Sequence, residues 1–269
     1  MRLFDTHCHM DVVAARSGDG DALLREARQV GLAAMVVPAV QPDTWARCAA
    51  ATHPHDDLAL ALGIHPQAVR DLSDEALDDA LHQLPTLLRA HGAVAVGEIG
   101  LDHRWDKAPE ARARQLRVFE AQLQIARQLD LPVLIHGLNA HDQTLRLVRS
   151  AAWPAAGGVL HSYSGSAELV EVYSRVEGLM FSFCGPVTWR NARKAPAAAR
   201  AVAADRLLIE TDAPYQPPWP HNDRPCRPSD LRLVAETVAA LREVPLEQLA
   251  EQTWANAQRL FRWPPSSGT

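Results

Sequence analysis

Short apolar runs alternate with longer amphipathic stretches along the whole chain. The apolar runs span four to six residues and are rich in Val, Leu, Ile and Ala, as expected of strands buried on both faces. The stretches between them repeat apolar residues at helical spacing. We predict strands over residues 2–7, 33–38, 58–62, 93–98, 132–136, 158–161, 179–183 and 206–211.

Predicted helices fill the intervals between these strands. They span residues 21–30, 43–51, 74–90, 109–129, 140–150, 167–175, 191–203, 229–241 and 246–261. The alternation predicts a parallel sheet built from βα units. Eight strands without a linker favour a single α/β domain, a (β/α)8 barrel over residues 1–263, with 264–269 as a disordered tail. An open doubly wound sheet is the alternative, but it would favour a Gly-rich first turn, and Asp5-Thr6-His7 is not one.

Composition narrows the class of protein. The chain has 269 residues, of which 47% are hydrophobic, and this is enough to bury one large core. With a net charge of −5, the protein as a whole is not a polycation. A polyanion such as nucleic acid would have to be bound locally, through a metal ion or a few arginines. Four widely spaced cysteines favour free thiols in a reducing cytosol.

The predicted location is cytoplasmic, without a membrane partner. The first residues predict a strand in place of a signal peptide. The longest uncharged apolar run, residues 32–40, is too short to cross a bilayer. An amphipathic outer helix looks alike whether it meets solvent or a second subunit, so the sequence defines no oligomeric state.

Metal-ligating residue types follow several predicted strands. His7 and His9 are two residues apart, so both side chains point to the same side of an extended segment. Comparable positions at or just after strand ends hold Glu98, His136, His161 and Asp212. In a barrel these strand ends meet on one rim. Four imidazoles and two carboxylates exceed the needs of one tetrahedral ion and suit a two-metal site with a shared carboxylate.

The bridge between two ions should be a carboxylate. No lysine lies at a strand end, which leaves neither a carbamylated lysine nor a Schiff base there, and Glu98 is placed for the bridging role. Motifs of other chemistries are absent: the chain has no Gly-x-Ser-x-Gly, Walker loop, Gly-x-Gly-x-x-Gly or His-Glu-x-x-His. Cys8 should point away from its neighbouring ligands and is interpreted as a core thiol.

Other polar residues are candidates for substrate contact. His65 follows the third strand and either contacts substrate or forms a hydrogen bond within its loop. Residues 213–229 hold six prolines after the last strand, and long loops of this kind are usually functional or disordered. The basic run 189–194 and two arginines of the proline-rich loop, Arg224 and Arg227, are either phosphate contacts or solvated charges. Of these, Arg227 is our candidate for substrate binding.

In combination and order, these motifs resemble the TatD-like metal-dependent hydrolases of the amidohydrolase superfamily. The resemblance covers nearly the whole chain and is carried by segments 4–11, 63–66, 97–102, 131–136, 161–165 and 210–215. It implies a (β/α)8 barrel with two or three divalent ions, of Mg, Mn or Zn. Several members are deoxyribonucleases that trim single strands from the 3′ end, which implies single-stranded DNA or RNA as substrate.

The resemblance also implies roles for individual residues. His7, His9 and Asp212 would hold one ion, and His136 and His161 would hold a second. Glu98 would bridge the two ions and share the catalytic role with Asp212, the general base. His65 would lie near the substrate phosphate, while Asp102 and Glu210 would orient ligands.

The chain departs from the family at two positions. Leu138 stands where members usually carry an arginine that helps to hold a phosphate, and Cys226-Arg227-Pro228 replaces an Asn-x-Pro element. The expected function is two-metal hydrolysis of a phosphodiester. The alternatives are a carbonyl hydrolase on the same site, acting on an ester, lactone or amide, and a component of a larger system that is inactive alone.

Overall fold

The computed structural model describes residues 1–104 and 107–263. The strands are β1 (Leu3–Asp5), β2 (Leu32–Ala39), β3 (Leu58–Leu62), β4 (Ala95–Asp102), β5 (Val133–Leu138), β6 (Gly158–Leu160), β7 (Leu179–Phe183) and β8 (Leu207–Ile209). The helices are α1 (Met10–Ser17), α2 (Gly20–Gln29), α3 (Trp45–Thr52), α4 (Pro66–Asp71), α5 (Asp74–Ala90), α6 (Pro109–Leu129), α7 (His141–Val148), α8 (Ala167–Tyr173), α9 (Lys194–Ala201), α10 (Leu231–Leu241) and α11 (Leu246–Phe261).

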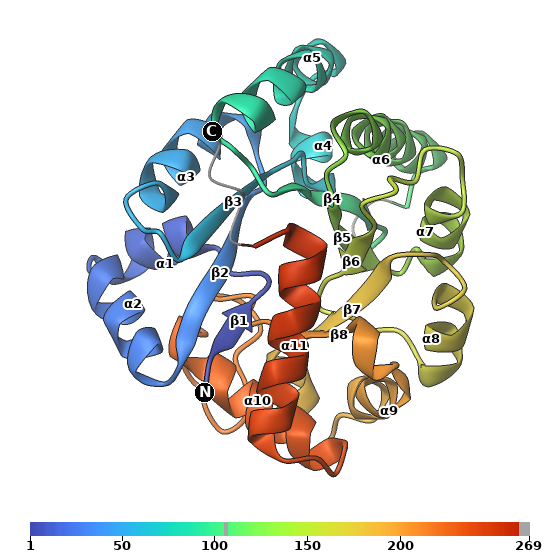
Figure 1. Ribbon diagram of the computed structural model, residues 1–269. Coiled ribbons are helices and arrows are strands. Elements are labelled where there is room, and N and C mark those ends of the chain that lie inside the picture. The colour runs from blue at the N-terminus through green and yellow to red at the C-terminus, as the bar shows by residue number, and fades with distance from the viewer. Residues whose placement is uncertain (105–106, 264–269) are drawn as a thin grey trace.

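The strands form one parallel sheet in the order of the chain, from β1 to β8. Each pairs with the next in parallel register, and helices lie around the outside of the ring (Figure 1). Buried Val, Leu, Ile and Ala fill the strands because both of their faces are covered. The protein is a single (β/α)8 barrel, which confirms the fold predicted from the sequence.

Backbone and side-chain hydrogen bonds join the first strand to the last. The Thr6 N–H donates to the Ile209 carbonyl at 3.2 Å, and the Asp212 N–H donates to the His7 carbonyl at 2.8 Å. The buried Asp5 carboxylate accepts the Thr211 N–H at 3.0 Å and the Thr211 hydroxyl at 2.6 Å. These bonds close the barrel and bring the ligand-bearing segments after β1 and β8 together.

The last helix covers one end of the barrel interior. Figure 1 shows α11 lying across the middle of the ring. Trp254 and Phe261 of α11 pack on Phe4 of β1, with ring centroids 5.5 and 5.9 Å apart. The same apolar cluster contains residues near the start of the other strands, such as Ala59 and Leu208. The opposite end, where the strands finish, is left for polar chemistry.

Two features differ from the sequence prediction. Strand β4 was expected to end at Glu98 but continues to Asp102, because a register shift between Val96 and Ile99 lets pairing with β5 resume beyond Glu98. Helices α1 and α4 were not predicted. Each begins directly after a candidate site residue, His9 or His65. Both helices are too short to produce a long periodic pattern of apolar residues in the sequence.

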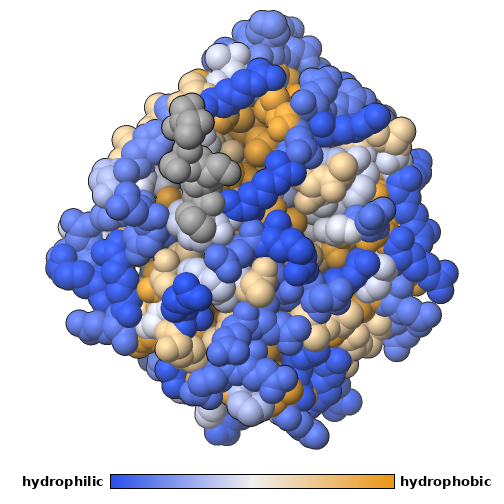
Figure 2. Space-filling model, in the orientation of Figure 1, coloured by the Kyte–Doolittle hydropathy of each residue, from blue (hydrophilic) through white to orange (hydrophobic). Residues whose placement is uncertain are grey.

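No helix within residues 1–104 and 107–263 is long and apolar enough to span a lipid bilayer. The face that surrounds α11 is largely hydrophilic, with smaller apolar patches between charged side chains (Figure 2). The predicted tail, 264–269, lies outside the described residues.

Candidate active site

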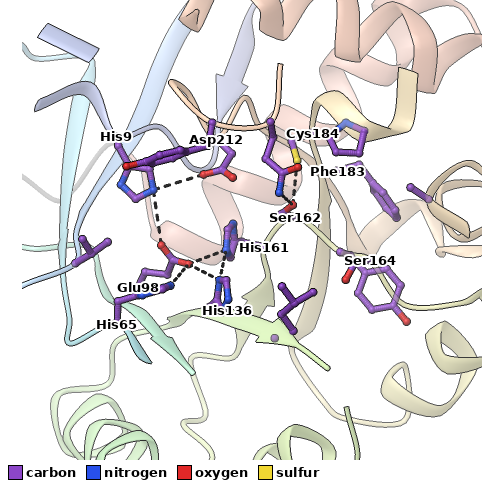
Figure 3. Close-up of a pocket in the computed structure, with 18 of the residues that line it drawn as sticks. His9, His65, Glu98, His136, His161, Ser162, Ser164, Phe183, Cys184 and Asp212 are labelled. Carbon is purple, nitrogen blue, oxygen red and sulfur yellow. Dashed lines mark hydrogen bonds and ion pairs between the residues drawn. The ribbon is translucent and has the colours of Figure 1, made fainter. Parts of the chain in front are cut away.

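The six predicted metal ligands come together at the carboxyl ends of the strands. Figure 3 shows five of them, His9, Glu98, His136, His161 and Asp212. His7 and His9 follow β1, His161 follows β6 and Asp212 follows β8, while Glu98 and His136 lie within β4 and β5. All but His136 are buried, and His136 is partly buried. Side chains separated by up to 205 positions in the chain thus form one cluster.

The Glu98 carboxylate lies at the centre of this cluster. Its Oε1 atom is 2.8 Å from His161 Nε2 and 2.9 Å from His136 Nδ1. Its Oε2 atom is 3.3 Å from His7 Nε2 and 3.7 Å from His9 Nε2. Each oxygen therefore faces a different pair of imidazoles.

Acceptors outside the cluster hold the outer nitrogens of three imidazoles. Asp102 Oδ2 lies 3.2 Å from His136 Nε2, and the Pro38 carbonyl oxygen lies 3.3 Å from His9 Nδ1. Glu210 Oε1 lies 3.3 Å from His161 Nδ1, a charge contact with poor hydrogen-bond alignment. An acceptor that takes the outer proton leaves the inner nitrogen as a lone pair.

The donor set fits divalent ions. His7 Nε2 and His9 Nε2 are only 3.2 Å apart, so both cannot carry a proton directed at the other. Asp212 Oδ1 lies 3.4 Å from His9 Nε2 and 3.8 Å from His7 Nε2. Converging imidazole lone pairs and carboxylate oxygens are the ligands preferred by zinc, manganese and related ions.

His65 turns a proton, in place of a lone pair, towards the cluster. Its Nδ1 accepts the Gln67 N–H at 3.1 Å as α4 begins, so a neutral His65 carries its proton on Nε2. That nitrogen lies 3.4 Å from Glu98 Oε1. His65 is therefore arranged as a proton donor facing the cluster. The hydrogen bond within the loop is confirmed, and contact of His65 with substrate stays a prediction.

The electrostatics of the site keep its carboxylates ionised. Burial disfavours the charged form of Glu98, but the surrounding imidazoles of His161, His65 and His7 outweigh it, so its pKa is well below the usual range. Burial also opposes ionisation of Asp212, yet the hydrogen bond from His9 and the neighbouring imidazoles hold its pKa below the ordinary value. Both groups are able to bind cations at neutral pH.

Buried glutamines of α6 hold the segments that carry His65 and Asp102. The Gln122 amide accepts the Ile64 N–H at 2.7 Å and donates to the Ile64 carbonyl at 3.1 Å. Gln115 makes the matching pair of bonds to the Asp102 backbone at 2.9 and 3.1 Å. Seven positions separate the two glutamines, so they share one face of the helix and fix two edges of the site.

A cavity of about 490 Å³ opens beside the cluster. It is lined by five of the predicted ligands and His65, and also by Arg104, Leu138, Tyr163, Phe183, Cys184 and Tyr215. Its size is in the range of small-molecule sites. Among the described lining residues, Arg104 is the one arginine or lysine.

Sequence reasoning missed Arg104. The guanidinium bonds to Asp102 through Nε at 3.1 Å and Nη2 at 2.7 Å. Asp102 is paired with Leu138 across β4 and β5, and the His103 N–H donates to the Leu138 carbonyl at 3.0 Å. No signal in the sequence marked it, because Arg104 lies in a turn just after β4, well beyond Glu98, where the strand was expected to end.

Arg227 is not brought into this cavity. Its guanidinium Nη1 lies 3.5 Å from Glu26 Oε2 on α2, and its backbone N–H donates to Asp230 at 2.8 Å. Arg224 also bonds to Asp230, at 2.7 Å. Both arginines therefore brace the proline-rich loop, and neither is among the described residues that line the cavity.

Comparison with known proteins agrees with this geometry. Residues 4–262 match the family model described as TatD related DNase. The chain is 34% identical to the "Uncharacterized metal-dependent hydrolase YabD" of Bacillus subtilis, over 97% of this chain and 99% of that protein. It is 31% identical to the "3'-5' ssDNA/RNA exonuclease TatD" of Edwardsiella piscicida, over 91% and 94% of the two chains.

A solved structure shows the same architecture. The crystal structure of YJJV, a TatD homologue from Escherichia coli K12, superposes with a TM-score of 0.89 at 33% identity and covers 98% of this chain and 99% of that one. The family match spans β1 to the end of α11, so it includes every strand that contributes to the cluster. The chain belongs to the TatD-related family and is a metal-dependent hydrolase.

Proposed function

We propose that this protein is a phosphodiesterase that trims single-stranded DNA or RNA from the 3′ end. The observation that carries the proposal is the position of Glu98, whose two oxygens face separate pairs of imidazoles. His7, His9 and Asp212 would hold one ion, His136 and His161 a second, and Glu98 would bridge them. Two such ions, of Mg, Mn or Zn, supply Lewis acidity to a phosphoryl oxygen and acidify water.

Asp212 is suited to act as the general base. Its carboxylate lines the cavity and stays ionised, because the pKa is held below its ordinary value. It can therefore accept a proton as water attacks phosphorus and the P–O bond to the leaving nucleotide breaks. His65 Nε2–H points toward the same centre and would donate to a phosphoryl oxygen.

Arg104 supports a phosphodiester over a carbonyl substrate. Its guanidinium lines the cavity and is oriented by Asp102, next to the position of Leu138. A guanidinium matches the geometry and charge of a phosphate, whereas a neutral ester or lactone gives it no counter-charge. Arg104 thus offers the cation that the family usually supplies from position 138. The exonuclease activity in the name of the Edwardsiella relative points to the same substrate class.

The test is degradation of a 5′-labelled single-stranded oligonucleotide by protein loaded with Mg, Mn or Zn. We expect a ladder that shortens from the 3′ end and disappears with chelator. Asp212→Asn should lower turnover by roughly 10² to 10⁴ without loss of fold, since general-base catalysis contributes about that factor. Asp205→Asn, an exposed aspartate remote from the cavity, is the matched control.

Two results would redirect the assignment. Wild-type rates in Asp212→Asn would exclude that residue as the base. No cleavage with any of the three metals, together with hydrolysis of a carbonyl ester, would identify a carbonyl hydrolase. No turnover of either class would favour a subunit that needs a partner.

A further inference from the structure

Exposed aromatic side chains gather at the mouth of the cavity. Four large hydrophobic side chains are exposed among the described residues, and three of them are Trp189, Tyr215 and Trp219, at 40%, 46% and 37%. All three lie in the segments that follow β7 and β8. Tyr215 lines the cavity, while the two tryptophans come two and three residues after Val187 and Gln216, which also line it. Grouped exposed rings beside a site usually mark a binding surface.

The two segments are fixed against one another. The Trp189 indole N–H donates to the Pro217 carbonyl at 2.9 Å, and the Trp219 N–H donates to the Thr188 hydroxyl at 2.8 Å. At Gly185 the approach is so close that an added Cβ would lie 1.9 Å from the Gln216 carbonyl oxygen. The Trp189 ring and the backbones of both segments are therefore held in place before any ligand arrives, which limits the entropy lost on binding.

Guanidinium groups accompany the rings. The Arg190 guanidinium carbon lies 3.9 Å from the centroid of the Trp219 ring, and that of Arg16 lies 5.4 Å from the Tyr215 ring. These distances are typical of cation–π contacts. A flat guanidinium stacked on an indole presents a second flat, charged face to the outside. Ring faces mixed with arginine suit a ligand that is aromatic and anionic at once.

We propose that this rim patch, formed by Trp189, Arg190, Tyr215 and Trp219, binds the unpaired bases of the nucleic-acid strand whose terminal phosphodiester enters the cavity. The inference rests on the proposed function, because it takes nucleic acid as the substrate. Aromatic and guanidinium faces stack on any base, so the patch would accept single strands with little sequence preference. A duplex would bind poorly, since its bases are already stacked on one another.

The binding experiment uses metal-loaded protein in the Asp212→Asn background, so that the strand is not consumed. The probe is a fluorescein-labelled oligothymidylate of twelve nucleotides, followed by anisotropy. Trp189→Ala and Trp219→Ala should each raise Kd by about 5- to 150-fold, the loss of affinity found when a single base-stacking aromatic is replaced by alanine. Arg190→Ala should also weaken binding, and its effect should shrink as salt rises, whereas the loss from either tryptophan should persist.

Matched controls separate stacking from general damage. Trp153→Ala removes an indole whose N–H also donates to a backbone carbonyl, that of Glu177 at 3.0 Å, but lies outside the patch. It should bind as well as the parent protein. An abasic strand of equal length and charge should bind weakly to the parent and not distinguish the variants.

The outcomes also separate this inference from the proposed function. If wild-type protein cleaves the strand but the patch variants bind it as tightly as the Asp212→Asn parent, the patch is excluded while the nuclease assignment stands. If the parent binds the strand through the patch yet wild-type protein cleaves nothing, the patch stands and the nuclease assignment fails. Equal affinity for abasic and normal strands, or no affinity for either, overturns the patch.

Discussion

Asp102 and Leu138 face one another across β4 and β5, and the guanidinium of Arg104 folds back onto the Asp102 carboxylate. In the proposed function, Arg104 just after β4 would therefore supply the phosphate-binding cation. Arg104→Ala should lower kcat/KM for a phosphodiester by roughly 10- to 100-fold, the value of a hydrogen bond to a charged group. Hydrolysis of a neutral ester should not change.

Two companion variants test whether activity depends on the charge alone, on the planar guanidinium, or on the position that supplies it. Arg104→Lys keeps the charge and loses the planar fork, so it should fall between wild type and Arg104→Ala. Leu138→Arg in the Arg104→Ala background should recover activity. A phosphodiester rate in Arg104→Ala equal to that of wild type would exclude the residue from substrate binding.

Metal removal should lower thermal stability as well as activity. An ion that binds only the folded protein stabilises it by about 2.7 kcal/mol at a hundred times its Kd. For a domain of this size that corresponds to an increase in Tm of about 5–10 °C. Glu98→Gln should lose most of this increase because the central ligand has lost its charge, whereas Glu26→Gln on α2 should keep it. Calorimetry with metal analysis tests this, and a full metal-dependent increase in Glu98→Gln would rule out Glu98 as a ligand.

Gly100 is predicted to tolerate no side chain. It has φ +138°, and an added Cβ would lie 2.0 Å from the His136 carbonyl oxygen. Gly100→Ala should therefore cost about 2–6 kcal/mol of unfolding free energy, from backbone strain plus overpacking, and should lower metal content by displacing β5. Gly92→Ala is the control, since φ is +61° but nothing lies within 4 Å. It should cost about 1 kcal/mol. If urea unfolding gave the same loss of unfolding free energy for Gly100→Ala and Gly92→Ala, the contact with the His136 carbonyl would not contribute to the destabilisation.

Asp230 should stabilise the proline-rich loop in a pH-dependent way. Burial disfavours its charged form, but Arg224, the Arg227 N–H and His221 outweigh this effect and hold its pKa below the ordinary value. Such a group contributes stability above its unfolded pKa, and this stability is lost as pH falls through the lower folded pKa. Asp230→Asn should cost about 1.5–3 kcal/mol at pH 7. The difference from wild type should shrink below about pH 4, and a difference that stays constant would refute the assignment.

The ligand cluster was predictable because each member lies at or just after the end of a predicted strand, and parallel strands end on one rim. His7, His136 and Asp212 could be assigned to that rim without knowledge of the contacts. Arg104 could not, since β4 was expected to stop at Glu98 and everything beyond it was interpreted as loop. The shift in register that prolongs β4 depends on how its backbone meets β5, which the composition of β4 does not reveal.

Long-range partners explain the remaining differences. Arg227 was interpreted as a phosphate contact, but its partner Glu26 lies on a helix two hundred positions earlier in the chain. The same limit applies to Trp189 and Trp219. Their local sequence gives no sign that the segments after β7 and β8 meet.

The hydrogen bonds that join the first strand to the last have a consequence for synthesis of the protein. His7 and His9 leave the ribosome first, whereas Asp212 and the Thr211 groups that bond to Asp5 emerge only with the last strand. A growing chain therefore carries histidines early but lacks a complete ligand set until β8 is made. Because a domain generally folds as a unit, metal capture would be delayed until the barrel is almost finished. Ion uptake would then report that the eighth strand has been made.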